Sequence, residues 1–231
     1  MHIPSFYPFV RKPLLKSSVI LLYPQDLLLI MSRSSHHHPQ QNGGHILRAH
    51  IASTAARLMA QDGMTDIGLA KKKAARQLGQ ADFAPLPDNA EVEAELRLYQ
   101  ALYQGDTQPA RLRFLREEAA HAMQRLACFN PYLTGSVLDG TAGEHSAIDL
   151  LLFADSAKDV EIFLLNEGIA FEHVEPRNDK AEAVLRLTMP DADIHLIIFP
   201  HHLERHHFRH RDGRPRERLR LDGLQQLLEA A

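Results

Sequence analysis

The sequence predicts an α+β protein in which an N-terminal helical module is followed by a mixed β-sheet flanked by helices. Within residues 45–107, apolar side chains recur at helical spacing between turn residues. Within residues 108–231, helical segments alternate with short apolar segments, a pattern typical of a sheet covered by helices. Residues 148–153 are almost all apolar, which is typical of a strand buried on both faces. The chain has 231 residues, which is long enough for both parts.

Capping and stop signals divide the helical module into three predicted helices. Asp66 and Asp88 stand where an N-cap residue accepts hydrogen bonds from the first turn of a helix. Gly63 and Gly79 follow the apolar pattern of the preceding helices, and glycine commonly ends a helix. The predicted helices span residues 46–61, 67–78 and 88–104.

The rest of the chain is predicted to hold five strands and three helices. Asn130 and Pro131 close the first of these helices, and Ser156 stands at the N-cap of the second. The predicted helices span residues 108–127, 156–165 and 219–228, and the predicted strands span residues 132–138, 148–153, 171–174, 183–189 and 194–199.

Composition argues against several classes of protein. The formal net charge of −3 provides no overall field that would attract nucleic acid or an anionic membrane. The chain has one cysteine, Cys128, so we expect no disulfide partner and a cytoplasmic location. Pro24 interrupts the apolar residues 19–31, which are too few for a membrane helix of about 20 residues. We therefore expect no membrane partner.

Residues 1–44 are predicted to be disordered or to be a mis-assigned N-terminal extension. Residues 1–30 show no structural periodicity, and Met31 is a natural initiator. The polar segment that follows contains a histidine run at residues 36–38, whose flexible surroundings do not favour a metal site.

The segment that is most informative about function joins the first two predicted strands. Gly135 and Ser136 follow an apolar strand, a gap of ten residues rich in glycine and small residues comes next, and Asp149 lies in the second strand. Glycine lets the main chain approach a phosphate closely, and free N–H groups in such a turn favour anions. The segment therefore predicts a Gly-Ser turn that is followed by a strand carrying a carboxylate.

Over about residues 110–200, this arrangement resembles the signature of the nucleotidyltransferase superfamily, which has the polymerase-β-like fold. In that superfamily a Gly-Ser turn grips a nucleoside triphosphate, and an Asp-x-Asp pair holds two Mg²⁺ ions. The resemblance implies that Gly135, Ser136 and Ser146 bind the nucleotide. It also implies that Asp149 is catalytic and a metal ligand, whereas Ala147 replaces the first Asp of the pair.

The metal site that the resemblance implies is incomplete. Residues i and i+2 of a strand point to the same side, so an Asp-x-Asp pair presents two carboxylates together. Ala147 removes one of them. A further carboxylate is expected at the start of a neighbouring strand, where Asp193 is the best match and Asp191 the alternate. Asp149 and Asp193 are thus the predicted catalytic residues and ligands of Mg²⁺ or Mn²⁺.

A basic segment near the C-terminus is a second candidate for phosphate binding. Residues 204–220 contain seven arginines and three acidic residues. Because a guanidinium fork matches the geometry of a phosphate, Arg214 and Arg216 are predicted to hold a nucleotide or an RNA backbone. Two alternatives remain: a solvated basic surface, or a metal site formed by His202 and His206 if the segment is helical.

The leading functional hypothesis is a nucleotidyltransferase-like protein that binds a nucleoside triphosphate and would transfer a nucleotidyl group to a protein, an RNA or a small molecule. The first alternative is a protein that keeps this fold without the chemistry, because of Ala147, and acts as a nucleotide-binding, RNA-binding or protein-interaction module. The second is a helical DNA-binding regulator, because residues 45–80 carry six basic and two acidic residues.

Overall fold

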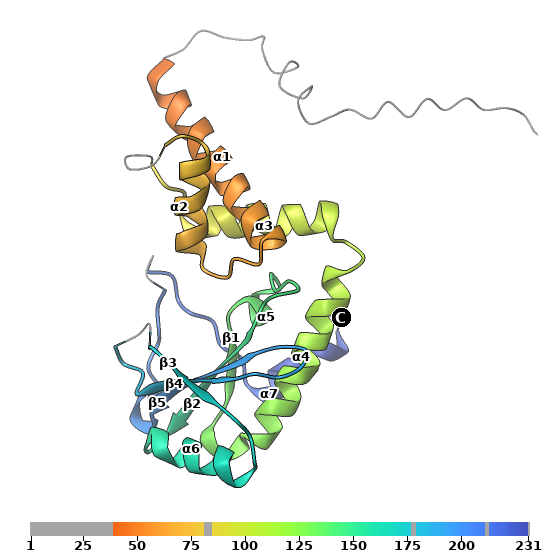
Figure 1. Cartoon of the computed structure of the whole chain (residues 1–231), viewed down its shortest axis with the longest axis vertical. Coiled ribbons are helices and arrows are strands. Elements are labelled where there is room, and N and C mark those ends of the chain that lie inside the picture. Colours follow the sequence, from red (N-terminus) through yellow and green to blue (C-terminus); the bar gives the residue numbers. More distant parts are fainter. Residues whose placement is uncertain (1–38, 81–84, 177–178, 211–212, 231) are drawn as a thin grey trace, which may run out of the picture. The chain divides into compact units, whose positions relative to one another are not determined.

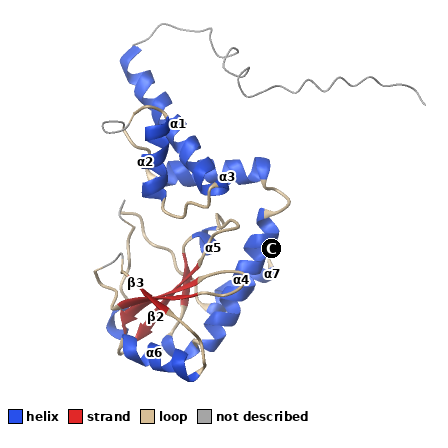
Figure 2. Ribbon diagram, in the orientation of Figure 1, coloured by secondary structure: helices blue, strands red, loops and turns tan. Residues whose placement is uncertain are grey.

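A five-stranded mixed sheet, preceded and flanked by helices, confirms the predicted α+β class (Figures 1 and 2). Residues Gln40–Ala231 form one compact unit, and the other unit, Met1–Pro39, lies almost entirely outside the described residues. Most of the predicted N-terminal extension, residues 1–44, is therefore outside the description as well. The computed structural model describes residues 39–80, 85–176, 179–210 and 213–230.

Three helices form the helical module, namely α1 (Pro39–Gln61), α2 (Ile67–Gln77) and α3 (Asn89–Tyr103). α1 begins earlier than the predicted residue 46, whereas α2 and α3 agree closely with the prediction. Small side chains let the helices approach closely around a shared apolar core. The buried residues of this core are Ile51, Ala52, Ala55, Leu58, Ala70, Ala74, Ala75 and Val92.

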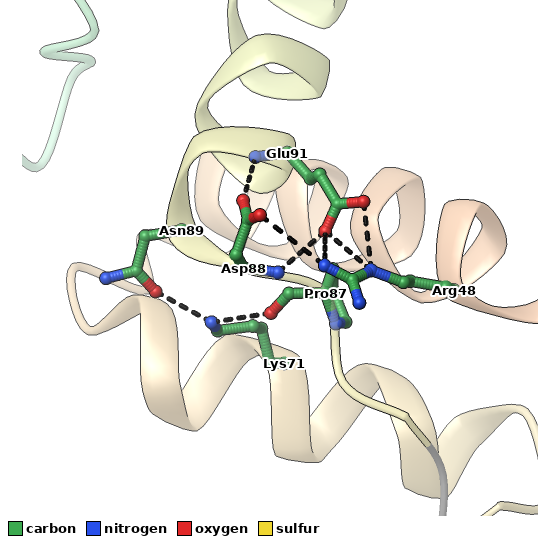
Figure 3. Close-up of polar contacts among 6 residues, drawn as sticks. All are labelled: Arg48, Lys71, Pro87, Asp88, Asn89 and Glu91. Atoms are coloured by element: carbon green, nitrogen blue, oxygen red, sulfur yellow. Dashed lines mark hydrogen bonds and ion pairs between the residues drawn. The ribbon is translucent and has the colours of Figure 1, made fainter. Parts of the chain in front are cut away.

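The first turn of α3 ties the three helices together (Figure 3). Asp88 and Glu91 form a capping box, in which each side chain accepts a hydrogen bond from the main-chain N–H of the other. Arg48 of α1 donates through Nε to both carboxylate oxygens of Glu91, at 2.9 and 2.8 Å. Lys71 of α2 donates to Oδ1 of Asn89 at 2.7 Å. The predicted capping role of Asp88 is thus confirmed.

The sheet has the strand order β1-β2-β5-β4-β3, so β5 lies next to β2 although β3 and β4 come between them in the sequence. β2 and β5 are parallel, and the other neighbouring pairs are antiparallel. A strand that follows the Gly-Ser turn is therefore flanked by the last strand of the chain. The strands are β1 (Tyr132–Thr134), β2 (Ile148–Ala154), β3 (Glu172–Val174), β4 (Ala183–Leu187) and β5 (Ile194–Pro200).

β1 is shorter than the predicted strand over residues 132–138, which is wrong at its C-terminal end. Gly135 adopts φ 75° and ψ −158°, and the chain then enters the short helix α5 (Ser136–Asp139). A positive φ favours glycine because a Cβ atom would crowd the main chain. The strand therefore ends at Thr134, and the predicted turn at Gly135 is confirmed.

Helices cover one face of the sheet and enclose the main core (Figure 1). Leu150 of β2, Leu196 of β5 and Leu115 of α4 are fully buried there. Removing this apolar surface from water is the main driving force for folding of the sheet. The covering helices are α4 (Gln108–Arg125), α6 (Ala157–Asn166) and α7 (Leu221–Glu229).

The segment between β5 and α7 contributes to the opposite face of the sheet. Its Phe208 packs with Phe153 and Phe199, with ring centroids 6.4 and 4.5 Å away. Its Leu219 pairs with Leu133 of β1 through two main-chain hydrogen bonds of 2.8 and 2.9 Å. The basic C-terminal segment therefore runs beside β1.

The alternative of a metal site at His202 and His206 required a helical segment, and these residues do not lie in one helix. A short 3-10 helix spans only His201–Leu203. Nε2 of His206 instead lies 2.7 Å from Nζ of Lys180.

Among the described residues, no helix combines the length and the apolar character that crossing a membrane requires.

We expect Glu91→Gln to remove part of the acid-induced loss of stability. The pKa of Glu91 is lowered chiefly by the hydrogen bond from Arg48, against the opposing effect of desolvation. A carboxyl with a lowered pKa stabilises the folded state above its unfolded pKa of about 4.3 and loses this contribution as the pH falls through its folded value. Because Glu91 is 39% exposed, we expect a difference of at most about 1 kcal/mol.

Urea unfolding at pH 7 and pH 3 measures this effect, and Glu95→Gln on the same helix is the control. The wild type and Glu95→Gln should lose more stability between the two pH values than Glu91→Gln loses. An equal loss in all three proteins would contradict the assigned role of the Arg48–Glu91 contact.

Candidate functional site

A row of polar side chains crosses all five strands on the face opposite α4. Thr134 lies opposite Asp149, Asp149 opposite His195, His195 opposite Arg186, and Arg186 opposite Glu172. Residues that are paired in register on neighbouring strands point to the same side of a sheet. We call these five residues the polar row.

Beside an apolar surface, the middle of the polar row is accessible to solvent, whereas Thr134 at its β1 end is fully buried. Leu151, two residues after Asp149 in β2, is only 1% exposed and belongs to a buried cluster with Tyr132, Phe153, Phe199 and Phe208. In contrast, the side chains of Asp149 and His195 are 31% and 35% exposed. Polar groups that remain open to solvent next to an apolar surface are candidates for ligand binding.

Asp149 and His195 are in direct contact at the centre of the row. Nδ1 of His195 lies 3.1 Å from Oδ1 of Asp149. This contact orients the imidazole ring. When Nδ1 carries the ring proton and donates it to the carboxylate, Nε2 is left as an acceptor. The sequence alone did not indicate the pairing of His195 with Asp149, because this pairing depends on the parallel register of β2 and β5.

The main chain of Gly135 lies directly against the carboxylate of Asp149. A Cβ atom added at Gly135 would be 2.8 Å from Oδ2 of Asp149. Glycine is therefore favoured here for two reasons: the residue has a positive φ, and the carboxylate of Asp149 occupies the space that a Cβ atom would need. The structure thus brings together Gly135 and Asp149, two of the predicted site residues.

Side chains of α3 and α4 hold α5 and the loop that joins α5 to β2. Each of these side chains donates to main-chain carbonyl groups, so the loop is tied to rigid helices and pre-organised. Sequence reasoning missed them, because no local motif links a helix to a loop so far along the chain. The bonds run from Gln100 to Thr141 at 2.9 Å, from Gln108 to Ala142 at 2.9 Å, from Arg111 to Glu144 at 3.0 Å, and from Arg116 to Val137 at 3.1 Å.

Ser136 and Ser146 hold different positions relative to this loop. The main-chain oxygen of Ser136 accepts from the N–H groups of Thr141 and Ala142, both at 3.0 Å. Oγ of Ser146 accepts from the N–H of Gly143 at 3.0 Å, so this hydroxyl stabilises the loop itself. Ser136 directly follows Gly135 and begins α5, whereas Ser146 has a contact inside the loop.

Asp193 directly precedes β5 and lies next to Ala147. Its main-chain oxygen accepts from the N–H of Ile148 at 2.9 Å, and the register of β2 and β5, continued by one residue, places Asp193 opposite Ala147. The pKa of Arg186 is raised chiefly by its hydrogen bond and ion pair with Glu172, and also by the charge of Asp193. Asp193 therefore adds negative charge to the same face, close to the polar row.

The residues present do not fit a centre for two Mg²⁺ ions. Ala147 supplies no ligand, and the position opposite Asp149 on β5 is His195, whereas Mg²⁺ prefers oxygen ligands. Among the described residues, no three His, Cys, Asp or Glu side chains are grouped closely enough to hold a metal ion. Asp149 and Asp193 remain the predicted oxygen ligands, and a cation between them would have to share its coordination with a substrate.

Arg216 and Arg214 lie in different surroundings. Nε of Arg216 donates to Oγ1 of Thr134 at 3.1 Å, at the β1 end of the polar row and next to Gly135. The guanidinium of Arg214 forms a bidentate ion pair with Glu93 of α3, at 2.9 and 3.0 Å. Of the two predicted phosphate contacts, Arg216 is thus beside the Gly-Ser turn and Arg214 is tied to α3.

Acidic residues near α5 limit the positive charge of the site. The pKa of Asp139 is raised, first because surrounding protein atoms displace water from its carboxyl and then because Glu93 and Glu217 are nearby. The residue as a whole is exposed, so we attribute only a modest change to this effect. An anion at the Gly-Ser turn would therefore depend on local hydrogen-bond donors and not on a broad positive field.

No protein-family model matches this chain, and no curated protein matches it at a significant level. The likeness to nucleotidyltransferases therefore stays a prediction that depends on Gly135, Ser136 and Asp149.

We expect Gly135→Ala to destabilise the protein by about 1 kcal/mol or more beyond the cost of a positive φ. The strained backbone alone costs about 1–2 kcal/mol, and the contact with Asp149 adds an overpacking cost. Gly168→Ala is the matched control, because Gly168 has φ 67° and no atom within 4 Å of an added Cβ.

Urea unfolding of both variants measures the difference, and the excess cost at Gly135 should shrink in an Asp149→Ala background. Equal losses for Gly135→Ala and Gly168→Ala would show that the carboxylate does not press against the turn.

Proposed function

We propose that this chain is a nucleotidyltransferase-like protein that binds a nucleoside triphosphate against the turn at Gly135 and Ser136. One observation carries the proposal: the main chain of Gly135 is in contact with the carboxylate of Asp149, at the end of a polar row on an otherwise apolar sheet face. A turn with main-chain N–H groups beside a strand carboxylate can position a triphosphate and a divalent cation, and nucleotidyl transfer depends mainly on positioning and on neutralising charge.

The residues of the chain divide the work of binding as follows. Main-chain N–H groups of the turn and the hydroxyl of Ser136 are suited to phosphate oxygens. Arg216, which donates to Thr134 at 3.1 Å, is placed to add a cationic donor on the β1 side. A bound divalent cation would neutralise the charge between the triphosphate and Asp149. The donors on α3 and α4 keep the loop in place while the ligand binds.

The acceptor of a nucleotidyl group would be a protein, an RNA or a small molecule. It would approach along the polar row, because the row continues from Asp149 through His195 to Arg186 and Glu172. Nucleotidyl transfer depends mainly on positioning and on neutralising charge.

A second candidate function is nucleotide binding without transfer. It is favoured by Ala147, which removes one carboxylate, and by His195, which occupies the position opposite Asp149 on β5. The two candidates share the same binding site and differ only in chemistry. A DNA-binding role of the helical module is less favoured, because Arg48, Lys71 and Lys73 are engaged by partners within the module.

The proposal predicts that Asp149→Ala changes nucleotide affinity in opposite directions with and without a divalent cation. With EDTA, loss of the carboxylate removes a repulsion and should tighten binding of a fluorescent triphosphate about two- to fivefold. With Mg²⁺ or Mn²⁺, loss of a ligand should weaken binding by about tenfold. Asp155→Ala, at the other end of β2, is the control and should behave as the wild type.

Transfer is tested in parallel with α-labelled triphosphates and a cell lysate as acceptor. Label transfer by the wild type that is lost in Asp149→Ala supports a transferase. A silent wild type, with transfer restored at least about tenfold above background by Ala147→Asp, supports the non-catalytic binder. Absence of triphosphate binding in the wild type would refute both candidates.

A further inference from the structure

The site differs from a two-Mg²⁺ centre in the residue that β5 contributes. The residue opposite Asp149 is a histidine, and the carboxylate and the imidazole already face each other across the parallel strands β2 and β5. Neither side chain is buried in the core, since 31% of Asp149 and 35% of His195 is exposed. The pair therefore offers one oxygen and one nitrogen donor to the same point on an accessible face.

The distance between these two donors matches the edge of a metal coordination sphere. Two ligands at adjacent corners of an octahedron, with bonds of about 2.1 Å, are about 3.0 Å apart. Oδ1 of Asp149 and Nδ1 of His195 are 3.1 Å apart. A cation can therefore take the place of the hydrogen bond once the ring turns its Nδ1 lone pair toward the ion, while the ring proton moves to Nε2 by exchange with water.

The other carboxylate oxygen of Asp149 faces the Gly-Ser turn. Oδ2 lies against Gly135, where a Cβ would be 2.8 Å away, so Oδ1 and Oδ2 point to opposite neighbours. A cation on the Oδ1 side thus lies between β2 and β5, within reach of a triphosphate held at the turn. Asp193, which directly precedes β5 and is two residues before His195, carries a negative charge that adds to the attraction for a cation.

We infer that this site takes a single divalent transition-metal ion, bound by Asp149 and His195, and not a pair of Mg²⁺ ions. Imidazole is a common ligand of transition-metal ions, and Mn²⁺ among them also takes carboxylate, water and phosphate oxygens, whereas Mg²⁺ prefers oxygen ligands and gives up its water reluctantly. The chain supplies two ligands, and the remaining positions are filled by water and by oxygens of the triphosphate. The inference rests on the proposed function for these triphosphate oxygens.

Mn²⁺ is the probe, because its free and bound forms are distinguished by electron paramagnetic resonance. In the presence of a non-hydrolysable triphosphate, the full-length wild type should bind Mn²⁺ at least about tenfold more tightly than Mg²⁺. Electron spin-echo modulation of the bound ion should show coupling to an imidazole nitrogen. The inference is overturned if Mn²⁺ does not bind, if no nitrogen coupling is seen, or if Mg²⁺ binds equally well.

Variants at residue 195 assign the nitrogen ligand. His195→Asp should lose the nitrogen coupling and shift the preference toward Mg²⁺, and His195→Gln should lose the coupling and weaken Mn²⁺ binding by about tenfold. His201→Ala, an exposed histidine beyond β5, is the control and should keep both properties. Thermal unfolding midpoints show whether each variant is folded, and persistence of the coupling in either folded variant would overturn the inference.

The same samples separate this inference from the proposed function. Triphosphate binding measured in EDTA does not involve the metal. If the triphosphate binds but bound Mn²⁺ shows no nitrogen coupling, the metal inference fails and the proposed function stands. If Mn²⁺ alone binds with nitrogen coupling and no triphosphate binds, the proposed function fails and the metal site stands.

Discussion

The contact between the main chain of Gly135 and the carboxylate of Asp149 is the constraint on which the rest of the site depends. It requires glycine, because the residue has φ 75° and because a Cβ would lie 2.8 Å from Oδ2. The turn at this glycine ends β1, directs the chain into α5, and leaves Thr134 opposite Asp149. One backbone conformation thus brings the Gly-Ser turn and a carboxylate together.

The surrounding structure holds this contact from two sides. Behind it, Gln100, Gln108 and Arg116 donate to carbonyl groups of α5 and of the following loop, so the return to β2 is fixed by helices. Beside it, Nδ1 of His195 lies 3.1 Å from Oδ1 of Asp149 and restrains the carboxylate. Groups that are held by rigid elements lose little freedom when a ligand binds, which favours affinity.

The parts of this fold that could be predicted from the sequence are those with local causes. Asp66, Asp88 and Ser156 cap helices through side chains that reach only the next turn, and all three caps are present. The predicted C-terminal limit of β1 was wrong. The apolar residues Val137 and Leu138 continue the strand pattern in the sequence, but the chain turns at Gly135. The pairing of Asp149 with His195 and the support of the loop by α3 and α4 could not be predicted, since both depend on the packing of distant segments.

The most direct measurement is a crystal structure of the protein with a non-hydrolysable nucleoside triphosphate and Mn²⁺. The account predicts phosphate density within hydrogen-bond distance of the main chain at Gly135 and Ser136, with the metal between Asp149 and His195. A triphosphate bound elsewhere on the protein, with the polar row unchanged, would contradict the account.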